Sequence, residues 1–111
     1  MTTIKESPRR VQRRRTKGWR MPENTVYVGR PSKWHNPFRV GAMGFLFENG
    51  SAVFYRGDGA TAANVTQLYR EEIAPKLRDA ARAELAGKNL ACWCLPGHPC
   101  HADVLLKLAN S

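Results

Sequence analysis

A stretch of twelve residues decides the fold, and it reads Leu90-Ala91-Cys92-Trp93-Cys94-Leu95-Pro96-Gly97-His98-Pro99-Cys100-His101. Its first half is an apolar run bounded by polar and turn-forming residues, which predicts a short buried strand over 90–95. Its second half predicts a turn into a helix, with Pro99 at the first helical position and Asp103 in the first turn. In α/β domains, ligand sites are commonly found where a strand turns into a helix.

All three cysteines and two of the three histidines of the chain lie in this stretch. Alternation along a strand predicts that Cys92 and Cys94 share one face, while Cys100 and His101 lie at the positive end of the following helix. One interpretation is a zinc (Zn²⁺) site formed by Cys92, Cys94, Cys100 and His101, or with His98 in place of His101.

Two other interpretations of the cysteines stand beside the zinc site. A helix N-terminus and nearby histidines favour a thiolate, so Cys100 is a candidate catalytic nucleophile with His101 as its base or acid. Alternatively, the cysteines pack as small buried hydrophobic residues with no chemical role.

Basic residues are concentrated near the N-terminus. The chain of 111 residues has a formal net charge of +9, and the segment 5–20 alone contributes +7, because it holds eight basic residues and one acidic residue. Such a block is typical of a segment that binds a polyanion, with nucleic acid as the first candidate, whereas a solvated tail is the alternative.

Cations interleaved with aromatic and amide side chains suggest a site for phosphate and base. The loop 30–38, rich in proline, adds two cations, an indole and an amide to the basic segment. The candidate ligand-binding residues are Arg13, Arg14, Arg15, Lys17, Trp19, Arg20, Arg30, Lys33, Trp34 and Asn36. We expect the basic segment and the cysteine cluster to flank a common cleft that holds a nucleotide or nucleic acid.

The rest of the chain predicts one small α/β domain. Periodicity and turn residues predict a strand over 25–28, a β-hairpin over 45–55, and helices over 62–74 and 76–86. Two apolar strands with a helical crossover between them predict a two-layer or three-layer α/β sandwich with a short, partly parallel sheet and an inserted hairpin. We expect residues 1–8 to be disordered and residues 9–111 to form the domain.

The composition also bears on compartment. No apolar run approaches the length of a membrane span, and the N-terminus does not resemble a signal peptide, so we expect no membrane partner. An odd number of cysteines argues against a disulfide scaffold, and we expect a cytoplasmic protein with reduced thiols.

Three groups of motifs resemble a family filed as domain of unknown function 4326, found in bacteria and their phages. They are Arg10-Val11-Gln12-Arg13-Arg14-Arg15-Thr16-Lys17-Gly18-Trp19-Arg20, Trp34-His35-Asn36-Pro37-Phe38, and Cys92-Trp93-Cys94 with Pro99-Cys100-His101-Ala102-Asp103. The resemblance runs from about residue 9 to residue 110 and implies that the basic segment belongs to the domain. The family usually has glycine at the position of His35, which argues against a general role for that histidine.

The cysteine motif is also similar to that of the DUF488-type α/β proteins, with Cys94 in place of their glutamate and Ala102 in place of their arginine. That similarity implies an anion or nucleotide site at the helix N-terminus and a fold that does not require a full zinc tetrad. We therefore expect a phage or bacterial protein that binds a nucleotide or nucleic-acid phosphate. The alternatives are an enzyme acting on nucleotides or bases through Cys100 and His101, and a phage protein that binds a host protein.

Overall fold

The computed structural model describes residues 7–47 and 49–111, so most of the segment 1–8 lies outside the described residues. The elements are β1 (Arg10–Gln12), β2 (Thr25–Tyr27), β3 (Gly44–Leu46), β4 (Ala52–Phe54), α1 (Ala62–Leu68), the π-helix η1 (Tyr69–Ile73), α2 (Ala74–Glu84), β5 (Asn89–Cys92) and α3 (His101–Asn110). Within the described ranges, no helix is both long and apolar enough to cross a membrane.

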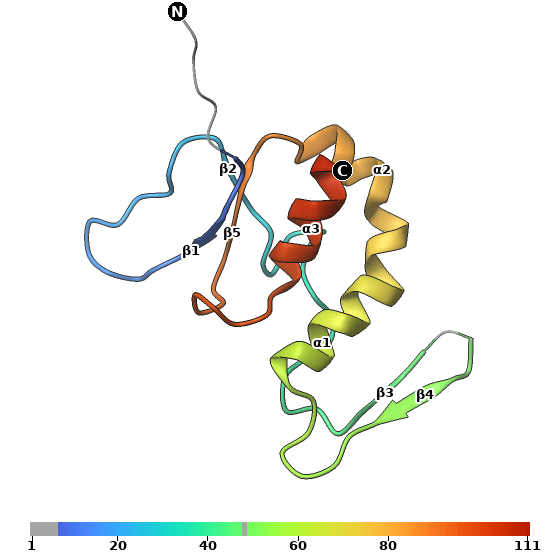
Figure 1. The fold of residues 1–111 in the computed structure, drawn as a ribbon. Helices are drawn as coiled ribbons and strands as arrows, with labels where there is room; N and C mark the ends of the chain where they lie inside the picture. The colour runs from blue at the N-terminus through green and yellow to red at the C-terminus, as the bar shows by residue number, and fades with distance from the viewer. Residues whose placement is uncertain (1–6, 48) are drawn as a thin grey trace, which may run out of the picture.

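The main sheet has the order β1-β5-β2, and both of its strand pairs are parallel. The predicted parallel pair is therefore confirmed, and it gains a second outer strand. Figure 1 shows α2 and α3 on one side of this sheet, which makes the architecture a two-layer α/β sandwich. On the opposite face of the sheet, residues 7–47 and 49–111 form no helical layer.

The strand β1 was not predicted, because it lies inside the basic segment and is only three residues long. It pairs in register with β5, with Val11 opposite Ala91, and the carboxamide oxygen of Asn89 accepts a hydrogen bond from the backbone N–H of Arg9. The start of the basic segment is therefore part of the sheet.

Arg10 fastens this edge strand to the loop after β5. Its guanidinium donates to the backbone carbonyls of His98 at 2.7 Å and Leu95 at 3.1 Å, and it pairs with the Asp103 carboxylate at 2.8 Å. Only 14% of its side chain is exposed. Arg10 thus holds the connection between Cys94 and Cys100 in one conformation.

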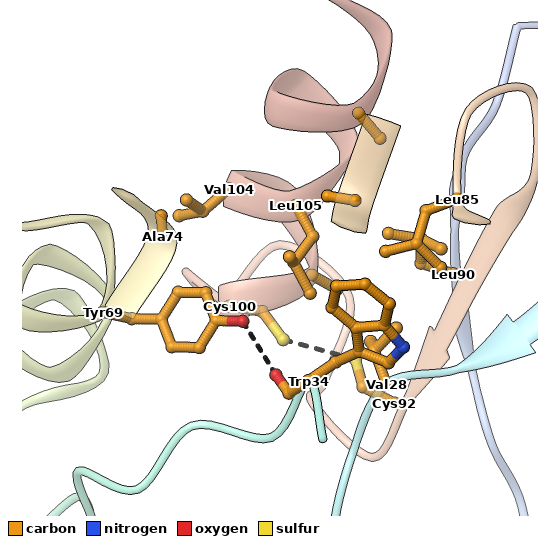
Figure 2. Packing of buried hydrophobic residues seen from close by; sticks show 13 residues of the cluster. Val28, Trp34, Tyr69, Ala74, Leu85, Leu90, Cys92, Cys100, Val104 and Leu105 are labelled. Atoms are coloured by element: carbon orange, nitrogen blue, oxygen red, sulfur yellow. Dashed lines mark hydrogen bonds between the residues drawn. The ribbon is translucent and has the colours of Figure 1, made fainter. Parts of the chain in front are cut away.

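The core lies between the sheet and the helices. Leu90, Leu105 and Tyr69 are fully buried, and Figure 2 shows Trp34 packed among them. The Tyr69 hydroxyl donates to the backbone carbonyl of Trp34 at 2.8 Å, and burial raises the pKa of this phenol above its usual value. This bond pins the loop 30–38 to the helical layer.

The helical crossover begins and ends largely where the sequence predicts. Pro75 lies in the first turn of α2, directly after η1, and the helical crossover continues through it. The π-helix η1 joins α1 to α2 without an intervening loop. Gly87 follows the C-terminal end of α2 and has a φ of +75°, the left-handed backbone conformation in which many helices end.

The last helix begins two residues later than predicted. Cys100 is its N-cap, with extended backbone, so Pro99 precedes the helix and does not open it. The strand before it ends at Cys92, and Cys94 belongs to the following loop.

The predicted hairpin is present as the antiparallel pair β3 and β4, with Phe45 opposite Val53. Figure 1 shows it projecting away from the main sheet. The Phe38 ring contacts the Phe45 ring edge-on, with centroids 5.0 Å apart, which attaches the hairpin to the loop 30–38.

We expect the substitution Arg10→Met to lower the free energy of unfolding by about 1–3 kcal/mol, because two carbonyls and a carboxylate lose a shared donor. Urea denaturation at fixed reductant and metal concentrations measures the loss. The matched control is Lys33→Met, which removes a more exposed ion pair to Glu84, with side chains 56% and 48% exposed, and is expected to cost no more than about 1 kcal/mol. If both variants lose the same free energy of unfolding, Arg10 does not hold the connection between Cys94 and Cys100 as described.

Candidate functional site

Successive residues of the central strand β5 and its extension serve opposite sides of the sheet. Leu90 and Cys92 belong to the core on the helical side. Trp93, the next residue, is 40% exposed, and its indole N–H donates to the Tyr27 hydroxyl at 3.1 Å. Strand alternation therefore creates two separate candidate sites.

The first candidate site is the sulfur cluster on the helical side. The sulfur atoms of Cys92, Cys94 and Cys100 all lie within 4.8 Å of one another. Cys94 and Cys100 are paired at disulfide distance, and Cys92 is a buried free thiol whose Sγ lies 3.2 Å from that of Cys100, as Figure 2 shows. Burial raises the pKa of the Cys92 thiol. The predicted grouping of the three cysteines is confirmed.

His101 stands beside this cluster with its tautomer fixed. Its Nε2 lies 2.8 Å from the Val28 carbonyl oxygen, an acceptor, so Nε2 carries the proton. Its Nδ1 is then a free acceptor, 3.7 Å from the Cys100 sulfur. Burial lowers the pKa of His101, and the ring is therefore neutral at neutral pH.

Such an arrangement has the donor chemistry of a metal site. Thiolates are the preferred ligands of zinc, and a ligand histidine normally donates its other ring N–H to a carbonyl or carboxylate. Cys100 is only 2% exposed, so a small cation suits it better than a bulky substrate does. The sulfur atoms of the three cysteines lie close to one another, whereas the His101 Nδ1 lies near the Cys100 sulfur.

A pocket of about 270 Å³ opens beside the cluster, and Cys94, Cys100 and His101 form part of its wall. The remaining lining residues come from α1 and two loops, and they are Asn36, Phe38, Val40, Ala62, Val65, Thr66, Leu95, His98 and Pro99. Its volume is below the range typical of drug-sized ligands. Its lining, as far as the structure describes it, contains no Lys or Arg, so no permanently cationic side chain faces a ligand there.

The second candidate site lies on the uncovered face of the sheet, and we call it the arginine–aromatic surface: Arg13, Arg15, Tyr27 and Trp93. The Arg13 guanidinium carbon lies 4.5 Å from the centroid of the Tyr27 ring and 4.9 Å from that of Trp93. The guanidinium of Arg15 lies 5.0 Å from the Trp93 centroid. Cation–π contacts of this kind hold planar cations in fixed positions.

The Tyr27 ring packs closely against the backbone of Gly29. A Cβ at position 29 would lie 2.5 Å from the Tyr27 hydroxyl oxygen, so a larger residue there would require the ring to shift. The Tyr27 hydroxyl then donates to the backbone carbonyl of Arg30 at 2.6 Å. The ring is fixed at both ends, under Arg13 and against the loop.

Other predicted basic residues follow in the long loop between β1 and β2. Arg14, Lys17 and Arg20 are exposed, and among the described residues they have no hydrogen-bond or ion-pair partner. Trp19 is half-buried in the same loop. These cations are free to bind an external anion.

The predicted residues of the loop 30–38 have structural contacts instead. Lys33 pairs with Glu84 of α2 at 2.7 Å, and Trp34 is 4% exposed, so its ring is not open to a base. Asn36 donates to the Val65 carbonyl and accepts from the N–H of Phe38. The Arg30 guanidinium reaches the Asn36 carbonyl at 3.4 Å.

The expected common cleft is therefore absent from the described part of the chain. The basic segment and the cysteine cluster are neighbours, since the Arg13 N–H donates to the Cys92 carbonyl at 2.7 Å. Arg10 lies on the helical side with the cluster, but it is bound to Asp103 and to two backbone carbonyls, whereas Arg13 and Arg15 lie on the opposite side of the sheet. Trp93 and Tyr27 were missed as site residues. Alternation from buried Cys92 would have placed Trp93 on the open face, and pairing of β2 with β5 would have placed Tyr27 beside it.

Among the comparisons with known proteins, only the one with family models gave a match, and that match covers nearly the whole chain. No match was found among curated proteins or among solved structures. The model of a single family matches residues 11–111, a range that includes the basic segment, the arginine–aromatic surface and the cysteine cluster. The chain belongs to the family described as domain of unknown function (DUF4326).

Proposed function

We propose that this protein binds single-stranded nucleic acid, with the arginine–aromatic surface and the adjoining basic loop as its contact area. One observation carries the proposal: the guanidinium of Arg13 lies over the rings of Tyr27 and Trp93, and that of Arg15 lies over Trp93, on a sheet face that no helix of the described residues covers. An open sheet with aromatic and cationic side chains is a common platform for unpaired bases and their phosphates.

Stacking prepares the arginines for phosphate. The Arg13 Nε–H is buried and has no hydrogen-bond partner among the described residues, so the two terminal NH2 groups are the donors left to face the oxygens of a phosphate. Little rotamer entropy then remains to be lost on binding, since Arg13 and Arg15 are already ordered. Trp93, 40% exposed, provides ring surface for stacking beside them.

A polymer suits this surface better than a mononucleotide does. Arg13, Arg15, Lys17 and Arg20 extend over eight residues of chain, so they reach several phosphates in a row, whereas a nucleotide places its phosphates at one end. The formal net charge of +9 adds a general attraction for a polyanion.

We expect the double variant Arg13→Gln/Arg15→Gln to bind a fluorescent oligo-dT at least about tenfold more weakly at physiological salt. The plot of log K against log salt should also become less steep, its negative slope shrinking in magnitude by about 1.4, or 0.7 for each lost phosphate contact. Fluorescence anisotropy measures both. Trp93→Ala is expected to cost about 1–3 kcal/mol of binding free energy.

The matched control for this experiment is Arg39→Gln/Arg56→Gln, which removes the same charge from exposed positions near the hairpin. If that control loses as much affinity as the double variant, net charge alone drives binding and the proposed surface is wrong. Binding that does not depend on salt would also contradict the proposal.

As a second proposal, we assign the sulfur cluster a structural zinc ion held by Cys92, Cys94 and Cys100, with Nδ1 of His101 as the fourth donor. Support comes from three sulfurs within 4.8 Å and from the His101 Nε2–H, which is already committed to a carbonyl. The reduced, zinc-loaded form suits the cytoplasm of a bacterium or phage-infected host, where thiols persist.

Catalysis by Cys100 and His101 is the weaker alternative, because a 2% exposed sulfur paired with Cys94 is not presented to a substrate.

Protein purified under reducing conditions is expected to carry about one equivalent of zinc by elemental analysis, and chelation is expected to lower its melting temperature, because a metal that binds only the folded state stabilises it. Cobalt substitution should give thiolate-to-metal charge-transfer absorption. Cys92→Ser should abolish stoichiometric binding, whereas His98→Ala, which alters an exposed histidine of the same loop, should leave it intact. Metal-free protein with unchanged stability, or a Cys94–Cys100 disulfide that persists in reductant, would overturn the zinc assignment.

A further inference from the structure

A groove of about 520 Å³ runs between α2 and α3. It lies on the helical side of the molecule, and the arginine–aromatic surface lies on the other side of the sheet. Figure 1 shows these two helices side by side on the same face of the sheet. The lining residues are Arg70, Ala74, Pro75, Arg78, Val104, Lys107, Leu108 and Ser111. The floor of the groove is therefore apolar, and its charged side chains are all cationic.

The cations of this groove are largely uncommitted. Arg78 and Lys107 have no hydrogen-bond or ion-pair partner among the described residues, and Arg70 has only the amide oxygen of Gln67, at 2.9 Å. No Asp or Glu is among the described lining residues of the groove, and two acidic side chains of its helices are paired with other cations, Asp103 with Arg10 and Glu84 with Lys33. An apolar floor with unpaired cations on its banks is complementary to an amphipathic anion.

The spacing of the cations selects the shape of that anion. Arg70 and Arg78 are eight residues apart on one bank, or about 12 Å along a helix axis, and Lys107 lies on the other bank. One carboxylate or phosphate head group cannot reach all three, which disfavours a fatty acid. An α-helix with an apolar stripe flanked by acidic residues places anions on both banks at once.

We propose that this groove binds an acidic amphipathic helix of a partner protein. The apolar face of the partner helix would lie on Ala74, Val104 and Leu108, and its acidic flanks would pair with Arg70, Arg78 and Lys107. This site is independent of nucleic-acid binding, because it lies on the helical layer and the arginine–aromatic surface lies on the opposite face of the sheet. Apolar contacts distinguish it from a phosphate-binding surface, which needs no such floor.

The experiment is a titration of the ¹⁵N-labelled protein with a capped peptide of about 14 residues that carries leucines at helical spacing with glutamates beside them. The control peptide has the same composition in scrambled order, so it has the same charge and no apolar stripe. We expect chemical shift changes confined to residues 70–78 and 104–111, and an affinity for the scrambled peptide at least about tenfold lower.

Charge reversal at exposed positions tests the pairing without disturbing the core. Arg78→Glu/Lys107→Glu is expected to weaken peptide binding at least about tenfold, whereas Arg56→Glu, at an exposed loop position, should change it less than about twofold. Equal binding of the scrambled peptide, shifts centred on Arg13 and Trp93, or equal effects of both variants would overturn the proposal. Laurate shifting the groove residues when the peptide does not would also overturn it, in favour of a small ligand. Oligo-dT binding by the charge-reversed variant reports separately on the nucleic-acid proposal.

Discussion

The parallel pairing of β5 with β1 and β2 is the constraint from which the rest of the molecule follows. A central strand presents consecutive side chains to opposite faces, so Leu90 and Cys92 enter the core while Trp93 reaches the open face. The strand and the residue that follows it thereby supply a buried thiol to one layer and an exposed indole to the other. A shift of register by a single residue would exchange the two roles and bury the indole.

Basic residues of the N-terminal segment divide into two kinds because β1 lies inside that segment. Arg10 points to the helical side and is largely buried against the loop 95–98, where it stabilises the fold. Arg13, three residues on, lies on the open face between two aromatic rings. Composition alone cannot separate a structural arginine from a binding one, since both contribute equally to the net charge.

Much of the fold was predictable from local signals, and the site was less so. Helical periodicity, the Asn49-Gly50 turn and the β-branched run at 25–27 predicted the helices, the hairpin and β2 with small errors at their ends. β1 has no such signal, because Arg10 and Gln12 give no apolar alternation and its strand conformation depends on pairing with β5. The burial of Trp34 could not be predicted from the sequence either, since a loop tryptophan becomes a core residue only through contacts with distant residues such as Tyr69.

A two-layer domain leaves two broad surfaces exposed, and here both are cationic but chemically different. The sheet face combines arginines with aromatic rings, whereas the groove between α2 and α3 combines cations with an aliphatic floor. A sheet and a helical layer together separate these surfaces by about 15 Å or more, which exceeds the screening length of about 8 Å at physiological salt. An anion on one face therefore repels an anion on the other only weakly, so the two ligands that we propose, a nucleic acid and an acidic protein segment, would not exclude each other through charge.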